Sequence, residues 1–222
     1  MPGGITSGVV VARGDALRLL DLFCGVGGAA MGYYRAGFTE IIGIDIAAQP
    51  HYPFTFVQAD ALEYVVAHAH EFDAIHASPP CQLFSRTRAM RRRYAAAHYI
   101  DLLTPLRAIL SEIKIPWVIE NVPGAPPPWD CRLCGTMFGL RGRGQIHRHR
   151  LFQCSEMLPL FPVTCSHTER AMNVYTSGQS RYGTEREFCD GMGVTWGNTR
   201  EGLQAIPPAY TELIGKLLIA RL

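Results

Sequence analysis

Cys81 stands where a sequence pattern predicts covalent chemistry. It lies in the stretch Ser-Pro-Pro-Cys-Gln at 78–82, after the apolar run 72–77, which predicts a buried strand. Open α/β sheets bind their ligands beyond the carboxyl ends of strands, so a thiol here is a candidate nucleophile. The two prolines fix the backbone immediately before it. The alternative is a turn with a packing cysteine, since free cysteine is common in protein cores.

Positive charge follows this thiol closely. Between 86 and 93 the chain carries Arg86, Arg88, Arg91, Arg92 and Arg93. Such a cluster is expected to lower the pKa of a nearby thiol, and it would also suit a phosphate backbone. A solvated basic helix face is the alternative. A second basic cluster occupies 141–150, although the net charge of the whole chain is only +2.

A carboxylate ends another apolar stretch. Residues 116–123 predict a buried strand that reaches Glu120 and Asn121, and the proline-rich run 123–128 terminates it. Burial disfavours a carboxylate anion, so Glu120 is expected to have a raised pKa and to be able to donate a proton. Asn121 is expected to brace the loop before Cys81 through backbone hydrogen bonds.

The elements that must position these groups alternate between strand and helix. The pattern predicts strands at 17–23, 40–46, 54–59, 72–77 and 116–123, and helices at 29–36, 61–69, 94–114 and 205–221. Thr104-Pro105 could divide the third helix. Residues 146–152 alternate in period two and predict another strand. We therefore expect one α/β domain over 1–222, with a mostly parallel sheet and helices on both faces.

Glycines and acids follow the first three strands. Gly25, Gly27 and Gly28 form a turn that would let a ligand approach a helix N-terminus. Asp45 ends the second strand and Asp60 follows the third. Without a Walker lysine, these features favour an adenosine-type cofactor over a nucleoside triphosphate. Asp60 could equally be a helix N-cap, and Asp45 a plain strand-terminating acid.

Three of these blocks together resemble the DNA (cytosine-5)-methyltransferase family. They are Asp-Leu-Phe-Cys-Gly-Val-Gly-Gly at 21–28, the Ser-Pro-Pro-Cys-Gln stretch, and Glu-Asn-Val at 120–122, and they occur in the family's order. The resemblance extends over about 17–152 and 200–221. It implies a Rossmann-like methyltransferase fold that moves a methyl group from S-adenosyl-L-methionine to carbon 5 of cytosine in double-stranded DNA. It also implies a covalent cysteine adduct and a base flipped out of the duplex.

The same resemblance assigns site residues. It implies catalytic roles for Cys81, Glu120, Arg148 and Arg150. The implied cofactor contacts are Phe23, Gly25, Gly27, Gly28, Asp45, Ile46, Asp60, Ala61, Pro79 and Gln204. The implied DNA contacts are Gln82, Ser85, Arg86, Arg88 and Asn121.

The chain departs from the family pattern in three places. The family's Gln-x-Arg-x-Arg element has Ile146 at its first position, with Gln145 one residue too early, and Gln204 replaces the usual asparagine of the last motif. Residues 155–195 are too short for the family's target-recognition region, so a separate subunit could supply recognition. An RNA cytosine-5 methyltransferase and a catalytically silent protein that binds cofactor or nucleic acid remain alternatives.

Composition favours a reduced intracellular environment. The seven cysteines are an odd number, the beginning of the chain lacks a signal-peptide pattern, and no apolar run reaches the roughly 18 residues that span a bilayer. We expect a monomeric cytoplasmic protein of a bacterial or phage-infected cell, without a metal. The alternative is a structural zinc site at Cys131, Cys134, Cys165 and His167, although a Cys-x-His pair is atypical.

Overall fold

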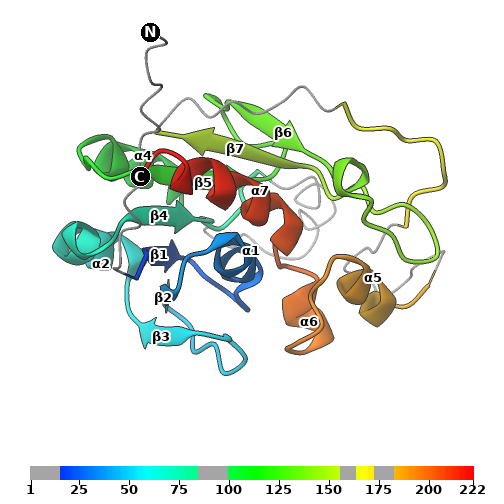
Figure 1. Cartoon of the computed structure of the whole chain (residues 1–222), viewed down its shortest axis with the longest axis horizontal. Coiled ribbons are helices and arrows are strands. Elements are labelled where there is room, and N and C mark those ends of the chain that lie inside the picture. Colours follow the sequence, from blue (N-terminus) through cyan, green and yellow to red (C-terminus); the bar gives the residue numbers. More distant parts are fainter. Residues whose placement is uncertain (1–15, 85–99, 156–163, 173–182) are drawn as a thin grey trace, which may run out of the picture.

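A computed structural model describes residues 16–84, 100–155, 164–172 and 183–222 of the protein. Its centre is a seven-stranded sheet of order β3-β2-β1-β4-β5-β7-β6 (Figure 1). The first five strands in chain order run parallel, whereas β7 is antiparallel to both its neighbours. The strands are β1 Arg18–Leu22, β2 Glu40–Asp45, β3 Thr55–Gln58, β4 Ala74–Ala77, β5 Trp117–Asn121, β6 Cys131–Leu133 and β7 Arg150–Cys154. The predicted mostly parallel sheet is confirmed.

Helices cover both faces of this sheet, as the sequence predicted (Figure 1). Helices α1 (Gly28–Ala36) and α7 (Pro208–Ile219) pack together on one face. Helices α2 (Ala61–His68) and α4 (Leu103–Ser111) pack on the other. Short helices α5 (Glu185–Gly191) and α6 (Thr199–Gly202) lie beside the sheet, and two 3-10 turns, η1 (Ala69–Glu71) and η2 (Gly135–Phe138), complete the described elements.

The alternation of side chains along β1 divides the core into two layers. Leu19 belongs to an apolar cluster with Tyr33 of α1 and Tyr210 of α7. Its neighbour Leu20 points to the opposite face and joins the cluster of Leu106 on α4. Because both faces of a parallel sheet are buried, its strands are nearly continuous apolar runs, which is why the pattern located them.

The backbones of helices α7 and α1 approach each other closely. A Cβ atom on Gly32 would lie 2.0 Å from Oγ1 of Thr211 and 2.2 Å from the carbonyl oxygen of Pro208, so only glycine fits there. The Thr211 hydroxyl donates a hydrogen bond of 2.8 Å to the Ala29 carbonyl. Helix α7 is thereby held against helix α1.

Two predicted boundaries were wrong. The strand expected from Ile146 begins only at Arg150, because the fully buried Ile146 leaves the sheet and packs in a third apolar cluster with Phe188. Of the helix expected at 94–114, residues 94–99 lie outside the described residues. Helix α4 begins at Leu103, where Asp101 accepts hydrogen bonds from the first amides, so Pro105 lies within its first turn.

No helix within the described parts of the chain combines the length and the hydropathy that a membrane crossing requires.

Candidate active site

The predicted catalytic residues gather at one edge of the sheet. Strands β4 and β5 are parallel, so Cys81, which follows β4, and Glu120, at the end of β5, lie at the same edge. Strand β7 runs the other way, and the register pairs Asn121 with Leu151, so Arg150 begins β7 at this edge too. The chain crosses from β3 back to β4 on the far side of β1, which places the switch point of the sheet here.

Glu120 and Arg150 form a buried ion pair. Nε of Arg150 lies 2.7 Å from Oε1 of Glu120, with side-chain exposures of 14% and 7%. Burial raises the pKa of Glu120, while the charges of Arg150 and Arg148 and a hydrogen bond with Ser78 lower it less strongly. The predicted raised pKa is confirmed. The Oε1 atom is close to Arg150 but accepts no well-aligned hydrogen bond from a described residue.

The Cys81 thiol lies within electrostatic range of this pair. Its pKa is raised by burial, lowered by the charge of Arg150, raised by Glu120 and lowered by Arg148, with burial dominant. The predicted lowering of the thiol pKa depended on the arginines at 86–93 and stays a prediction, while the described surroundings of Cys81 raise this pKa. The arginines that oppose burial come from the β7 end of the sheet, whereas Arg86, Arg88 and their neighbours up to 93 lie outside the described residues.

The loop before Cys81 is held by Asn121, as predicted. The buried Asn121 amide donates a hydrogen bond of 3.1 Å from Nδ2 to the Pro79 carbonyl. Its Oδ1 accepts from the Val122 amide at 2.9 Å. Both Nδ2 and Oδ1 of Asn121 thus bond to the protein backbone. A DNA contact by Asn121 stays a prediction. Gln82 is exposed next to the thiol, and Ser85 lies outside the described residues.

Arg148 connects the catalytic edge to the C-terminal part of the chain. Its Nη2 donates a hydrogen bond of 2.8 Å to the Ala205 carbonyl, and its own carbonyl accepts one of 2.9 Å from the Tyr210 hydroxyl. Among the described residues, only Arg148 (φ 36°) and Phe23 (φ 56°) are non-glycine residues with positive φ. Strained backbone of this kind clusters at functional sites, and both residues were assigned to the site from the sequence.

The glycine turn after β1 adopts backbone conformations that favour glycine. Gly25 and Gly27 both have positive φ, of 48° and 81°. The Gly25 amide donates a hydrogen bond of 3.1 Å to Oδ2 of Asp45, whose Oδ1 accepts from the Ala47 amide. Gly28 has a packing reason for lacking a side chain, because a Cβ atom there would lie 2.3 Å from the carbonyl oxygen of Ile206.

The next two strand ends supply complementary surfaces. Ile46, directly after β2, is 70% exposed, which is unusual for a large apolar side chain and suits contact with a planar base. Asp60 is the N-cap of α2 and accepts from the Leu62 and Glu63 amides through Oδ1, which confirms the helix-cap interpretation. Buried Ala61 begins that helix. These residues fit a nucleoside with a charged amino-acid end, as S-adenosylmethionine has.

Gln204 and Pro79 complete the predicted cofactor set. Gln204 is exposed in the turn between α6 and α7, next to the Ala205 carbonyl that Arg148 contacts. Pro79 is buried beneath the thiol loop. Their contacts with a cofactor stay predictions, as do those of the glycine turn and of Asp45 and Asp60.

Sequence reasoning missed a buried polar chain behind Glu120. The Tyr33 hydroxyl lies 3.1 Å from Nδ1 of His76, and Nε2 of His76 lies 2.8 Å from the Ser78 hydroxyl. Burial lowers the pKa of His76 to about 3, so the imidazole is neutral. Ser78 in turn hydrogen-bonds to Glu120. The sequence feature that could have revealed this chain is His76 inside the apolar run 72–77, because a buried polar side chain needs hydrogen-bond partners.

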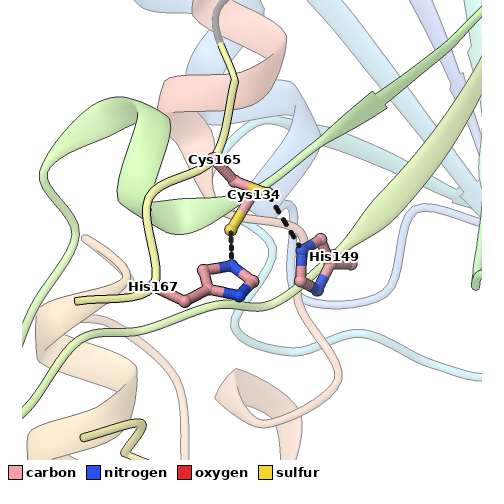
Figure 2. A group of neighbouring side chains, drawn as sticks. All are labelled: Cys134, His149, Cys165 and His167. Atoms are coloured by element: carbon pink, nitrogen blue, oxygen red, sulfur yellow. Dashed lines mark hydrogen bonds between the residues drawn. The ribbon is translucent and has the colours of Figure 1, made fainter. Parts of the chain in front are cut away.

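The suggested zinc residues also need correction. The structure brings Cys134, Cys165 and His167 together, but the fourth member of the group is His149 and not Cys131 (Figure 2). Cys131 belongs to strand β6 and packs against the apolar cluster between the sheet and helices α1 and α7.

Comparison with known proteins identifies the family. The chain belongs to the C-5 cytosine-specific DNA methylases, whose family model matches residues 17–127. That match includes the glycine turn, the cysteine loop and Glu120.

Individual relatives match over shorter or more distant stretches. The Type II methyltransferase M1.HphI of Haemophilus parahaemolyticus is 30% identical over 95 residues, covering 36% of this chain and 25% of that protein. The solved structure of DNMT2 from Spodoptera frugiperda has 19% identity and a TM-score of 0.47, covering 68% of this chain and 54% of its own. The methyltransferase EhMeth of Entamoeba histolytica has 14% identity and a TM-score of 0.42, covering 62% and 52%. The chain spans about a quarter of its curated relative and half of these structures.

Proposed function

We propose that this protein methylates carbon 5 of cytosine in DNA, with S-adenosyl-L-methionine as donor and Cys81 as nucleophile. The proposal rests on one observation. The Cys81 thiol lies within electrostatic range of the buried Glu120–Arg150 pair, beyond the strand ends. A nucleophile, an acid of raised pKa and a fixed cation are the groups this reaction needs. Membership of the cytosine methylase family supports the same chemistry.

The reaction begins by removing the aromaticity of the cytosine ring. Cys81 gives its proton to solvent and its sulfur bonds to carbon 6, while Glu120 donates a proton to nitrogen 3, so carbon 5 gains electron density. When bound, S-adenosylmethionine supplies an electrophilic methyl group. Loss of the carbon 5 proton to a base then re-forms the carbon 5–carbon 6 double bond and expels the Cys81 thiolate, and the nitrogen 3 proton returns to Glu120.

Arg150 serves this sequence by holding Glu120. Its ion pair fixes the carboxyl group next to the thiol loop, and its charge offsets part of the burial effect on the pKa values of both Glu120 and Cys81. Both reacting groups are largely buried, so a stacked base could not reach them. We infer that the cytosine leaves the duplex to enter the site, at a cost of a few kcal/mol.

The cofactor is assigned to the neighbouring strand ends. We infer that the Gly25–Gly27 turn receives the amino-acid end, Asp45 the ribose hydroxyls, and Ile46 and Asp60 the adenine. These groups lie at the ends of β1, β2 and β3, on one side of the switch point between β1 and β4.

A cellular assay tests the proposal. The full chain would be expressed in a methylation-deficient bacterium, and 5-methylcytosine mapped by bisulfite sequencing, with Cys81→Ala as inactive control and Cys131→Ser as matched cysteine control. We expect methylation with the wild type and Cys131→Ser but none with Cys81→Ala. Equal methylation with Cys81→Ala would exclude Cys81 as nucleophile.

Purified protein distinguishes the substrate. Radiolabelled methyl transfer from S-adenosylmethionine would be measured with matched duplex DNA and RNA oligonucleotides. Transfer to DNA supports the proposal, and transfer to RNA alone would replace DNA with RNA as the substrate. Cofactor binding without transfer to either would favour the silent-protein alternative.

A further inference from the structure

Four potential metal ligands meet at the end of strands β6 and β7. Cys134, His149, Cys165 and His167 each present one ligand atom, and these atoms all lie within 4.8 Å of one another (Figure 2). Sγ of Cys134 lies 3.3 Å from Nε2 of His167, and Sγ of Cys165 lies 3.7 Å from Nε2 of His149. Ligand atoms around tetrahedral zinc are separated by about 3.3–3.8 Å, as follows from metal–ligand distances of about 2.0–2.3 Å.

The sheet itself places the first two of these residues. Strands β6 and β7 are antiparallel, and their register ends with Leu133 opposite Arg150. One step further along both strands brings Cys134 opposite His149, at the separation of a cross-strand pair. The Gly135 amide donates a hydrogen bond of 2.7 Å to the His147 carbonyl, so the pairing of the two segments continues beyond the strands.

The other two residues come from one extended segment. Cys165 and His167 are two positions apart, so their side chains fall on the same side of an extended backbone. Hydrogen bonds fasten this segment to Gln145: the Gln145 amide donates to the Arg170 carbonyl, and the Met172 amide donates to the Gln145 carbonyl.

This segment has little apolar burial to hold it in place. Of residues 164–172, only Met172 is buried, and most of the others are exposed. Segments that cannot bury enough apolar surface are commonly anchored by a metal or a disulfide. His167 is further oriented by His147, whose ring stacks on it at 3.8 Å between centroids and 10° between planes. The four ligand groups are thus held in place by the sheet, by Gln145 and by this stacking.

We propose that Cys134, His149, Cys165 and His167 bind a structural zinc ion. A set of two thiolates and two imidazoles without a carboxylate is typical of structural zinc. The ion cross-links segment 164–172 to the β6–β7 pair. Since His149 directly precedes Arg150, the same cross-link steadies the start of β7.

The geometry explains why the Cys-x-x-Cys spacing was misleading. Residues 131–133 form a strand, and three steps along a strand cover roughly 10 Å, which separates the Cys131 and Cys134 side chains too far for one ion. Cys131 instead packs in the apolar cluster near Cys154, and burial raises the pKa of its thiol to about 12. Cys131, at the start of the strand that leads to Cys134, is therefore a matched control outside the site.

Zinc content of the purified full chain tests the proposal. After dialysis against zinc-free buffer, elemental analysis should find one zinc per chain in the wild type and in Cys131→Ser. We expect at least a fivefold lower content in Cys134→Ser and in Cys165→Ser. Equal zinc content in Cys134→Ser and Cys131→Ser would overturn the site.

Cobalt provides a readout that does not depend on folding of the variants. The metal-free wild-type chain would be titrated with Co²⁺ alone and monitored by absorption spectroscopy. Intense d–d bands of tetrahedral cobalt with thiolate charge-transfer bands, displaced by one equivalent of zinc, are expected. Absence of these bands would show that the cluster is not a metal site. A Cys134–Cys165 disulfide that persists when zinc is added would show the same.

Discussion

The buried carboxyl group of Glu120 contacts the Arg150 guanidinium at 2.7 Å, although the two residues belong to different strands, β5 and β7. This pair joins the parallel part of the sheet to its antiparallel edge. Its removal should therefore change both stability and catalysis.

Loss of one partner should be worse than loss of both. Arg150→Met leaves the Glu120 carboxylate buried and unpaired, at an expected cost of roughly 3–5 kcal/mol in the free energy of unfolding. The double variant Glu120→Gln with Arg150→Met removes the buried charge and should recover part of that loss. Urea unfolding of the wild type, both single variants and the double variant measures the coupling.

The control for this cycle is an exposed pair. Arg143 contacts Glu187 at 3.0 Å, but the two side chains are 67% and 36% exposed, so solvent screens the pair. Arg143→Met should have a much smaller effect on unfolding than Arg150→Met. Similar losses in the two variants would contradict a special role for the buried pair.

The pH dependence of methyl transfer should report Cys81 and Glu120 together. The reactive form needs Cys81 as thiolate, with a pKa above 9.0, and Glu120 protonated, with a pKa above 4.5. The value of kcat/KM should therefore rise with pH up to the Glu120 pKa and stay level between the two pKa values. Above the Cys81 pKa it should fall. In Glu120→Gln only the thiolate fraction varies with pH. Its kcat/KM should therefore rise up to the Cys81 pKa without a level region.

Glu120→Gln should also lower kcat at least ~10²-fold, the usual scale for a general acid. A nearly normal rate, or an unchanged pH profile, would assign the nitrogen 3 proton to another group. Retained binding of S-adenosylmethionine, measured by calorimetry, would show that the variant is folded and that the loss is chemical.

Stability at acid pH should depend on His76. Its pKa is about 3 in the folded protein and near 6.5 in the unfolded chain, so the unfolded state binds more protons between these values. The contribution of His76 is fully present above pH 6.5 and is lost as the pH falls below it. His76→Gln cannot titrate, so its unfolding free energy should fall less steeply between pH 6.5 and pH 4.

Comparing His76→Gln with the wild type separates the effect of His76 on stability from that of its neighbour Asp21. Asp21 is the register partner of His76 on β1, and burial raises its pKa, so its contribution has the opposite sign and is lost as the pH rises. Both proteins retain Asp21, and the difference between their unfolding curves removes its effect. Identical slopes would show that His76 does not titrate on unfolding.

The sequence predicted the parallel part of the fold well, for a physical reason. Strands buried on both faces are apolar runs, and the acids and glycines at their ends are conspicuous by contrast, as Asp45 and Gly25 were. Because parallel strands end at one edge, order along the chain was enough to predict which residues meet there.

The antiparallel edge was harder to predict. Strand β6 has only three residues, and the alternation from Ile146 to Phe152 arises partly from a loop whose apolar residue anchors elsewhere. The metal candidate depended on contacts between β6, β7 and segment 164–172, which no local spacing reveals. His149 stood between two arginines already assigned to catalysis, so its own chemistry was overlooked.

The seam between α1 and α7 gives a last prediction, because it ties the C-terminal helix to the catalytic edge. Gly32→Ala would place a methyl group against Thr211 and Pro208, and overpacking of this kind costs about 1–3 kcal/mol or more. Arg35→Ala, on the exposed side of α1, is the control and should leave stability nearly unchanged. Thermal unfolding compares the two. Because Tyr210 on α7 donates to the Arg148 carbonyl, Gly32→Ala should also lower methyl transfer, and equal melting temperatures would show that the seam tolerates a methyl group.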